Sequence, residues 1–338
     1  MSEFRIDQIK SQDATRGPDV AGITTFTGVS GIVMPSGDTA YRGGRDRAVF
    51  HGAYLGGGTP ASKILDYVTF STAGNAVNFG DLTENMWGGT ASSSTRGLFA
   101  GSISTNITNH VEYVTISSTG NGFEFGDLTY ISRGNGGLSN STRGIFLGGF
   151  NPTQVSNIDY VTFTTTGNAS VFGELKTASG DGGSFASPTR GIFYSARVPA
   201  PAYVRDIEYL TIATKGNTQD FGDPFESRIN EGTGCSNSTR GVAFQMNTGS
   251  EVNTMEYVTI ASKGNAQDFG DLTDTRYDGG AASSEIRGLS YGGFNNPARD
   301  NNIDQFLFAT LGNATDFGDA LNGNDRGDGL SDCHGGLG

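Results

Sequence analysis

The stretch HVEYVTISSTGNGFEFGDL, residues 110–128, contains two candidate β-strands joined by a tight turn. Its first half is rich in β-branched and aromatic residues, and Val111 and Tyr113 alternate with their neighbours at a period near two, as in a strand. The central Gly-Asn pair favours a hairpin because both residues tolerate positive φ. The second half alternates again through Phe123 and Phe125. We therefore expect antiparallel β-structure here.

The same pattern occurs six times, with 46 residues between the first two Gly-Asn pairs (121−75) and 49 between the third and fourth (217−168). The asparagines of these pairs are Asn75, Asn121, Asn168, Asn217, Asn265 and Asn313. An arginine that opens a short apolar stretch keeps the same interval, at Arg47, Arg96, Arg143, Arg190, Arg240 and Arg287. A regular period of roughly 20–50 residues indicates a repeat architecture. Residues shared by all copies should build the scaffold, and residues that differ between copies should recognise a ligand or partner.

Each copy contains three clear strands and a less distinct fourth, and none shows a helical period. Four antiparallel strands in about 47 residues match a β-propeller blade, close to the kelch type at about 50. The sequence therefore predicts an all-β protein with a kelch-like, six-bladed β-propeller over residues 41–338. A linear β-solenoid and a homotrimeric stalk of three intertwined chains are the alternatives. Unequal loop lengths between copies favour the propeller.

Residues 1–40 lack the repeat and carry two strand-like pieces separated by Gly, Pro and Ser. This segment is interpreted either as an anchor or as a ring-closing segment. The C-terminal sequence DGLSDCHGGLG is similar to the fourth strand of the last copy, so the array ends within its sixth unit. Closure of the ring should therefore use pairing between the end segments.

Composition excludes several classes of function. The formal net charge of the 338 residues is −13, which disfavours nucleic-acid binding because such a surface repels phosphate backbones. No stretch of about 18 apolar residues is present, so no membrane insertion is expected. The start MSEFRIDQIK has no apolar segment of a secretory signal, which indicates synthesis and folding in a cytoplasm. Cys235 and Cys333 match no metal-ligand or disulfide spacing, and no cofactor is expected.

Each copy also carries an acid just before the strand that begins YVTI, at Asp66, Glu112, Asp159, Glu208, Glu256 and Asp304. One arginine and one acid per copy predict an ion pair or an arginine-to-backbone link on every blade, with the arginines largely buried. A ring of six anion-binding arginines is the functional alternative, and we favour the structural interpretation.

Catalytic and metal motifs are absent from the sequence. The histidines His51, His110 and His334 do not recur in the array and belong to no nucleophile, metal or phosphate motif. The acid after each Phe-Gly lacks the alternating Asp/Asn ladder of a calcium loop, so a turn-capping role is more common for it. We therefore expect neither an enzyme nor a metal site.

Two segments vary between copies: the loop after the arginine strand and the segment after Phe-Gly-Asp. The second segment contains the candidate ligand-contact or receptor-contact residues Trp87, Tyr130, Arg133, Arg276 and Tyr277. Aromatic and arginine side chains beside Asn and Asp suit recognition of a saccharide or a protein surface. Packing of the same rings between adjacent blades is the alternative.

The repeat YVTIxxxGNAxDFGDLT, followed by SSxTRGxFxGG, resembles kelch-like repeats in virion structural proteins of tailed phages that infect marine cyanobacteria. The opening phrase GPDVAGITTFTGVSGIVMPSG, residues 17–37, is similar to the segment that precedes such arrays. Glu174, Gln305 and the pair Asp223-Pro224 depart from the pattern, which weakens the idea of six equal ligand sites.

The resemblance implies a virion component, such as a tail fibre, a tail-associated protein or a capsid-surface protein, assembled in the host cytoplasm. Residues 1–40 would attach it to other virion proteins, and the variable loops would contact a host-surface glycan or protein. No catalytic residues come with the resemblance. The alternatives are a purely structural decoration or adaptor protein of the capsid or tail, and a carbohydrate-active enzyme.

Overall fold

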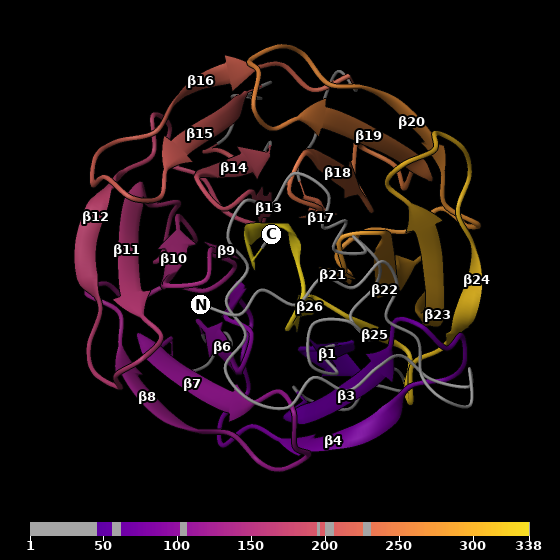
Figure 1. The fold of residues 1–338 in the computed structure, drawn as a ribbon, viewed down its shortest axis with the longest axis horizontal. Coiled ribbons are helices and arrows are strands. Elements are labelled where there is room, and N and C mark those ends of the chain that lie inside the picture. Colours follow the sequence, from indigo (N-terminus) through magenta and orange to yellow (C-terminus); the bar gives the residue numbers. More distant parts are fainter. Residues whose placement is uncertain are drawn as a thin grey trace, which may run out of the picture. The chain divides into compact units, whose positions relative to one another are not determined.

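The computed structural model describes residues 46–55, 62–101, 107–194, 197–199, 206–225 and 231–337, all of which belong to one compact unit, residues 37–338. This unit is a six-bladed β-propeller in which six four-stranded antiparallel sheets surround a central axis (Figure 1). The predicted all-β, six-bladed architecture is confirmed. The expectation that residues 1–40 form an anchor or a ring-closing segment falls on residues outside the described ranges.

In every blade the strands follow one another from the axis to the rim. Blade 1 contains β26 (Asp328–Ser331), β1 (Arg47–His51), β3 (Ile64–Thr69) and β4 (Val77–Asp81). Blade 2 contains β5 (Thr90–Ser92), β6 (Arg96–Ala100), β7 (His110–Thr115) and β8 (Phe123–Asp127). Blade 3 contains β9 (Gly136–Ser139), β10 (Arg143–Leu147), β11 (Asn157–Thr162) and β12 (Ser170–Glu174).

The other three blades have the same order of strands. Blade 4 contains β13 (Gly183–Ala186), β14 (Arg190–Tyr194), β15 (Ile207–Thr211) and β16 (Gln219–Gly222). Blade 5 contains β17 (Thr233–Ser236), β18 (Arg240–Phe244), β19 (Thr254–Thr259) and β20 (Gln267–Asp271). Blade 6 contains β21 (Gly280–Ser283), β22 (Arg287–Asn295), β23 (Ala298–Leu307) and β24 (Thr315–Asp319). Outside the blades are the two-stranded sheet β2 (Tyr54–Leu55) with β25 (Asn324–Asp325) and the 3-10 helix η2 (Gly335–Leu337).

The fourth strand of each sequence copy crosses to the next blade and becomes its innermost strand. The last such strand, β26, completes blade 1 by pairing antiparallel with β1, where Ala48 lies opposite Ser331. The ring therefore closes by pairing strands from the two ends of the array, as the sequence predicts. No helix among the described residues is long and apolar enough to cross a membrane.

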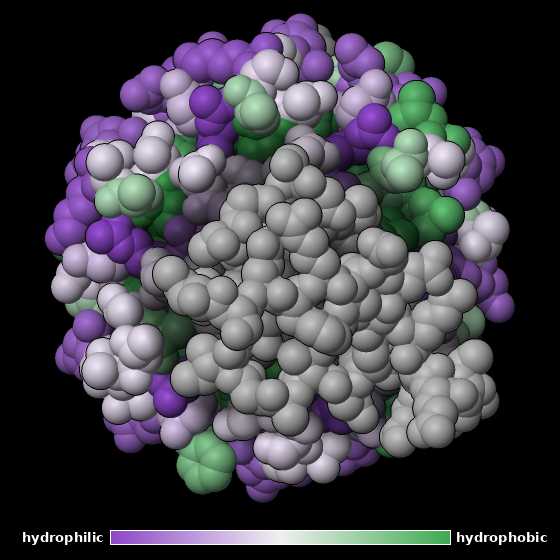
Figure 2. Space-filling model, in the orientation of Figure 1, coloured by the Kyte–Doolittle hydropathy of each residue, from purple (hydrophilic) through white to green (hydrophobic). Residues whose placement is uncertain are grey.

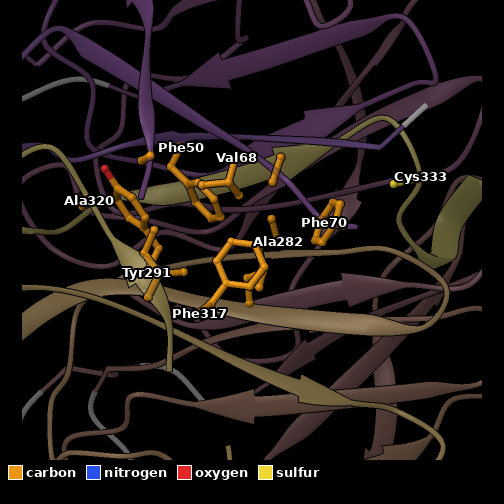
Figure 3. Close-up of a cluster of buried hydrophobic side chains, with 12 residues drawn as sticks. Phe50, Val68, Phe70, Ala282, Tyr291, Phe317, Ala320 and Cys333 are labelled. Atoms are coloured by element: carbon orange, nitrogen blue, oxygen red, sulfur yellow. The ribbon is translucent and has the colours of Figure 1, made fainter. Parts of the chain in front are cut away.

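The hydrophobic core is divided into clusters that join neighbouring blades. Figure 3 shows the cluster between blades 1 and 6, where Phe50 and Phe70 face Tyr291 and Phe317. The rings of Phe50 and Tyr291 are stacked, with centroids 4.3 Å apart. Because each Phe-Gly phenylalanine lies in such a cluster, the repeat period is the period of the blade interfaces. The visible edge of the ring is mainly hydrophilic, with separate apolar residues between the polar ones (Figure 2).

The Gly-Asn turns join the blades at the rim. Gly120 donates its N–H to the carbonyl of Phe79 in the preceding blade at 2.8 Å, and the side-chain oxygen of Asn121 accepts from the N–H of Asp81 at 3.1 Å. Gly80 has a φ of +154°, and a Cβ there would lie 2.2 Å from the carbonyl oxygen of Gly120. Only glycine fits such a close approach. Both glycines therefore recur because they form the contact between blades.

Candidate functional site

The repeated arginines link each blade to the next. Arg143 donates from Nη1 to the carbonyls of Ile212 at 2.8 Å and Ala213 at 2.9 Å, and its guanidinium lies 5.0 Å from the ring centre of Tyr160. The other five arginines bond in the same way to the next blade: Arg47 to Ile116, Arg96 to Phe163, Arg190 to Ile260, Arg240 to Phe308 and Arg287 to Phe70.

This arrangement decides between the two links expected from the sequence. The arginines form the backbone link, and none of the six has an ion pair with the acid of its copy in the described structure. All six are of intermediate burial, and the link that they form joins neighbouring blades. In five of the six blades the guanidinium also lies over a tyrosine of the third strand.

The repeated acids are buried and bind the loop that follows the outer strand of the preceding blade. Glu112 is fully buried and accepts from the Thr83 N–H at 2.8 Å, the Thr83 hydroxyl at 2.6 Å and the Glu84 N–H at 2.9 Å. The other five accept from main-chain N–H groups in the same way: Asp66, Asp159, Glu208, Glu256 and Asp304. Burial raises the pKa of Asp66, Asp159 and Glu208 above the usual range. Both repeated charge sets therefore belong to the scaffold.

Where the structure describes them, the two variable segments of a copy lie at the same end of the axis. In antiparallel blades the loop after the second strand and the loop before the next innermost strand lie at the same end of the sheet. Backbone bridges join them, as between Arg133 and Phe150, Gly180 and Arg197, and Tyr277 and Phe294. The described residues of these variable segments are thus gathered around one mouth of the central channel.

Six residues occupy equivalent places around this mouth, two or three positions before each innermost strand. Main-chain hydrogen bonds link some neighbouring members. The N–H of Gly134 donates to the carbonyl of Trp87 at 2.8 Å, and the N–H of Asp181 donates to the carbonyl of Gly134 at 2.8 Å. The N–H of Arg326 donates to the carbonyl of Asp278 at 2.5 Å. We call this set the mouth ring: Trp87, Gly134, Asp181, Glu231, Asp278 and Arg326. The position is equivalent in every blade, yet its side chains range from none to aromatic, acidic and basic.

The mouth ring uses a backbone conformation that favours glycine. Gly134 has a φ of +60°, and the same left-handed region holds Asp181 at +57°, Asp278 at +59° and Arg326 at +53°. Non-glycine residues are uncommon in this region, and such strain clusters at functional sites. Three copies therefore place charged side chains where glycine would be more stable.

The basic side of the mouth is ordered by stacking. The guanidinium carbons of Arg326 and Arg133 lie 4.7 Å and 5.0 Å from the ring centre of Trp87. The Tyr54 ring is 6.5 Å from Trp87 and 5.2 Å from the Arg326 guanidinium. Stacking of this kind holds guanidinium groups in place and leaves their edges free to donate. The Nε atoms of Arg133 and Arg326 are buried and have no hydrogen-bond partner.

The acidic side of the mouth is incompletely paired. Asp278 Oδ2 lies 3.5 Å from Arg326 Nε, and Glu231 Oε1 lies 3.8 Å from Arg197 Nη1, and both distances are longer than an ordinary hydrogen bond. Asp181 Oδ1 is buried without a hydrogen-bond partner. Burial, followed by repulsion from Glu231, raises the pKa of Asp181 to about 8. The same causes hold the pKa of Asp278 well above its usual range.

The mouth opens into a cavity of about 60 Å³ whose walls are largely glycine. Gly88, Gly136 and Gly182 are among its lining residues, together with Asp181 and Arg326. A site for one water needs about 10–15 Å³, so the cavity has room for a few waters or for one small polar group. A larger ligand would insert one hydroxyl, amino or carboxylate group and leave its remainder above the mouth ring.

Three of the five candidate contact residues lie at this mouth. Trp87 belongs to the mouth ring, and Arg133 and Tyr277 directly adjoin it in sequence. The guanidinium groups of Arg133 and Arg326 both lie over the ring of Trp87. Tyr277 is half-buried, with its ring 5.5 Å from that of Phe294.

The other two candidates do not belong to the site. Arg276 is fully buried and forms ion pairs with Asp300 at 3.0 Å and Asp304 at 2.7 Å, so its assignment as a contact residue is wrong. The acid of blade 6 draws this arginine inward. Tyr130 packs against the cluster between blades 2 and 3, and its hydroxyl donates to the Gly148 carbonyl at 3.2 Å.

The charged members of the mouth ring were not predicted from the sequence. Asp181, Asp278 and Arg326 stand in Gly-rich stretches (SGDGG, RYDGG and NDRGDG) that are typical of turns. Alignment of the copies on the following strand would have placed them at one equivalent position. The place of His334 was not predicted either: it lies at the other end of the innermost strands, with Nε2 3.0 Å from the Ser92 carbonyl and 3.3 Å from the Ser139 hydroxyl.

The structure is a six-bladed β-propeller with charged and aromatic side chains gathered at one mouth of its channel. The chain matches no known family model, and no curated protein is similar to it. Across the described ranges, no group of three or more His, Cys, Asp or Glu side chains is arranged to hold a metal ion.

The raised pKa of Asp181 predicts an effect of pH on stability. Between its ordinary value of 3.8 and about 8, the folded protein binds more protons at this group than the unfolded chain does, so stability falls as the pH rises through this window. Asp181→Asn cannot ionise and tolerates the left-handed backbone. Its melting temperature should therefore rise relative to wild type between pH 5 and pH 9.

The gain in free energy of unfolding should reach a few kcal/mol, because one pKa unit corresponds to about 1.4 kcal/mol. Circular dichroism melting curves at pH 5, 7 and 9 measure it. The control is Asp220→Asn, in the same blade, whose side chain is 65% exposed and which should behave like wild type. A difference between Asp181→Asn and wild type that does not change with pH would contradict the prediction.

Proposed function

We propose that this protein is a non-enzymatic recognition module of a phage virion, in which the propeller is a rigid scaffold and the mouth of the channel binds a host-surface glycan. The observation that carries the binding role is the left-handed backbone of Asp181, Asp278 and Arg326. These charged residues occupy strained positions, and Asp181 and Arg326 have buried atoms without partners, as expected for groups that await a ligand.

The scaffold role is supported by the repeated residues. The arginines, acids, asparagines and rim glycines are all used in contacts between blades, which leaves the non-repeated residues for recognition. A mixed set of guanidinium and carboxyl groups suits a ligand that carries hydroxyl groups and a carboxylate. An acidic sugar residue has this chemistry and can place one polar group in the small cavity.

The virion part of the proposal rests on the sequence resemblance. A tail fibre or tail-associated position fits it, with residues 1–40 attached to other virion proteins. The alternative of a carbohydrate-active enzyme draws on the raised pKa of Asp181 and Asp278, since a glycosidase acid needs such a shift. A structural decoration protein remains the alternative in which the mouth has no ligand.

The test is a glycan array probed with the wild-type protein and with Asp181→Gly, Asp278→Gly and Arg326→Gly. Glycine fits the backbone at each position, so all three variants should keep or raise the melting temperature. Each should weaken binding by about 10–100-fold, because a hydrogen bond to a charged group contributes about 1.5–3 kcal/mol.

The matched control is Phe123→Ala, which removes a rim side chain that is 62% exposed and should leave binding unchanged. Equal binding by the glycine variants and wild type would overturn the assignment of the mouth. Release of sugar products from a bound glycan would favour the enzyme, and no glycan binding by a protein that enters particles would favour the decoration role.

A further inference from the structure

Blade 6 lacks a contact that the other five blades share at the rim. In those blades a tyrosine of the third strand lies under the repeated arginine, with guanidinium-to-centroid distances of 4.4, 4.5, 5.0, 4.7 and 4.7 Å in chain order. In blade 6 Gln305 occupies the position of this tyrosine. It pairs with Leu289 of the second strand, as Tyr257 of blade 5 pairs with Val242. The guanidinium of Arg287 therefore has no tyrosine beneath it.

Two other departures from the repeat occur beside Gln305. Leu307 replaces a threonine found in the other five copies, and Leu311 stands where they have Ala, Thr or Lys. Their side chains are unusually exposed for leucine, at 45% and 55%. All three departures line one cavity of about 330 Å³, which also includes Arg287. The corresponding cavity of blade 1, lined by Tyr67, does not include the repeated arginine.

We propose that this cavity, the blade-6 pocket, binds the side chain of a tyrosine presented by a partner protein. The pocket retains the arginine that stacks on a tyrosine ring in every other blade, while the ring itself is missing. A cation over an aromatic face is a favourable contact. An engineered cavity of about 150 Å³ binds benzene in another protein, so the space is sufficient for a phenol ring.

The exposed leucines indicate why the ring belongs to a protein. A free phenol would fill the space beneath Arg287 and leave Leu307 and Leu311 in contact with water. A peptide that carries the tyrosine would also cover both leucines with its flanking residues, and burial of their apolar surface would strengthen binding. The pocket lies at the rim of blade 6, so the proposal is independent of the glycan site at the mouth.

The test uses the full-length protein and two probes, 4-methylphenol and the peptide acetyl-Leu-Tyr-Leu-amide, titrated by NMR. Both should bind saturably, and the peptide should bind at least about tenfold more tightly because it covers the leucines. The peptide with leucine in place of tyrosine, and 4-methylcyclohexanol in place of the phenol, should bind at least about tenfold more weakly, since neither has a π face.

Gln305→Tyr supplies the ring from the chain itself and should abolish binding of both probes while raising the melting temperature by about 2 °C. Leu307→Thr restores the residue of the other copies. It should weaken binding of the peptide severalfold and have little effect on binding of 4-methylphenol. Absence of saturable binding to wild type, or equal binding to Gln305→Tyr, would overturn the proposal. Equal affinity for the peptide and 4-methylphenol would overturn the choice of a protein partner.

Discussion

A chain that ends at Gly327 should lose the cooperative unfolding transition of the full-length protein. Removal of β26 leaves blade 1 with three strands and exposes the hydrogen-bonding edge of β1. It also removes Leu330, which is buried among Val49 and Leu65. Loss of one such leucine costs about 2–5 kcal/mol, and the broken strand pairing adds to this, against a total domain stability of about 5–15 kcal/mol.

Melting curves and size-exclusion chromatography measure this effect. The matched control is a chain that ends at Cys333, which keeps β26 and lacks η2; it should unfold cooperatively at a moderately lower temperature. If the chain ending at Gly327 instead melted like wild type as a monomer, β26 would not be the strand that closes the ring.

The second large effect is expected for Glu112→Ala at the interface of blades 1 and 2. The side chain is fully buried and satisfies three donors of Thr83 and Glu84, which would be left without partners. A hydrogen bond to a charged group contributes about 1.5–3 kcal/mol. We expect a loss of about 3–5 kcal/mol in the free energy of unfolding, measured by urea denaturation.

Two further variants separate this contact from a general effect of charge. Glu124→Ala removes an exposed acid from the same blade and should change stability by less than about 0.5 kcal/mol. Glu112→Gln retains one acceptor oxygen, so its free energy of unfolding should fall by less than that of Glu112→Ala. Equal small losses for Glu112→Ala and Glu124→Ala would show that the acid does not hold the loop.

The blade number and strand order could be predicted from the sequence because each copy carries complete strand and turn signals. The partners of the repeated charges could not. Arg143 bonds to a residue 69 positions away, and Glu112 to one 29 positions away. A repeat gives each copy the same residues, so an arginine and an acid within one copy look like partners even when each contacts a different neighbouring copy.

The candidate site was predicted at the level of loops. The variable segments do meet at the channel mouth, since antiparallel topology brings their ends of the strands together. The direction of single side chains was beyond the sequence: Arg276 turns inward to Asp304, while its neighbours Tyr277 and Asp278 lie at the mouth. Asp278 also has a left-handed backbone, with a φ of +59°.

The most direct test of the mouth ring as the recognition site is amide hydrogen exchange of the protein. It is measured with and without a glycan that binds in the glycan-array experiment. We predict slower exchange in the segments that carry Trp87, Asp181, Asp278 and Arg326, with unchanged exchange in the Gly-Asn turns at the opposite ends of the blades. Protection confined to the Gly-Asn turns or the outer strands, with no change at the mouth ring, would contradict this assignment.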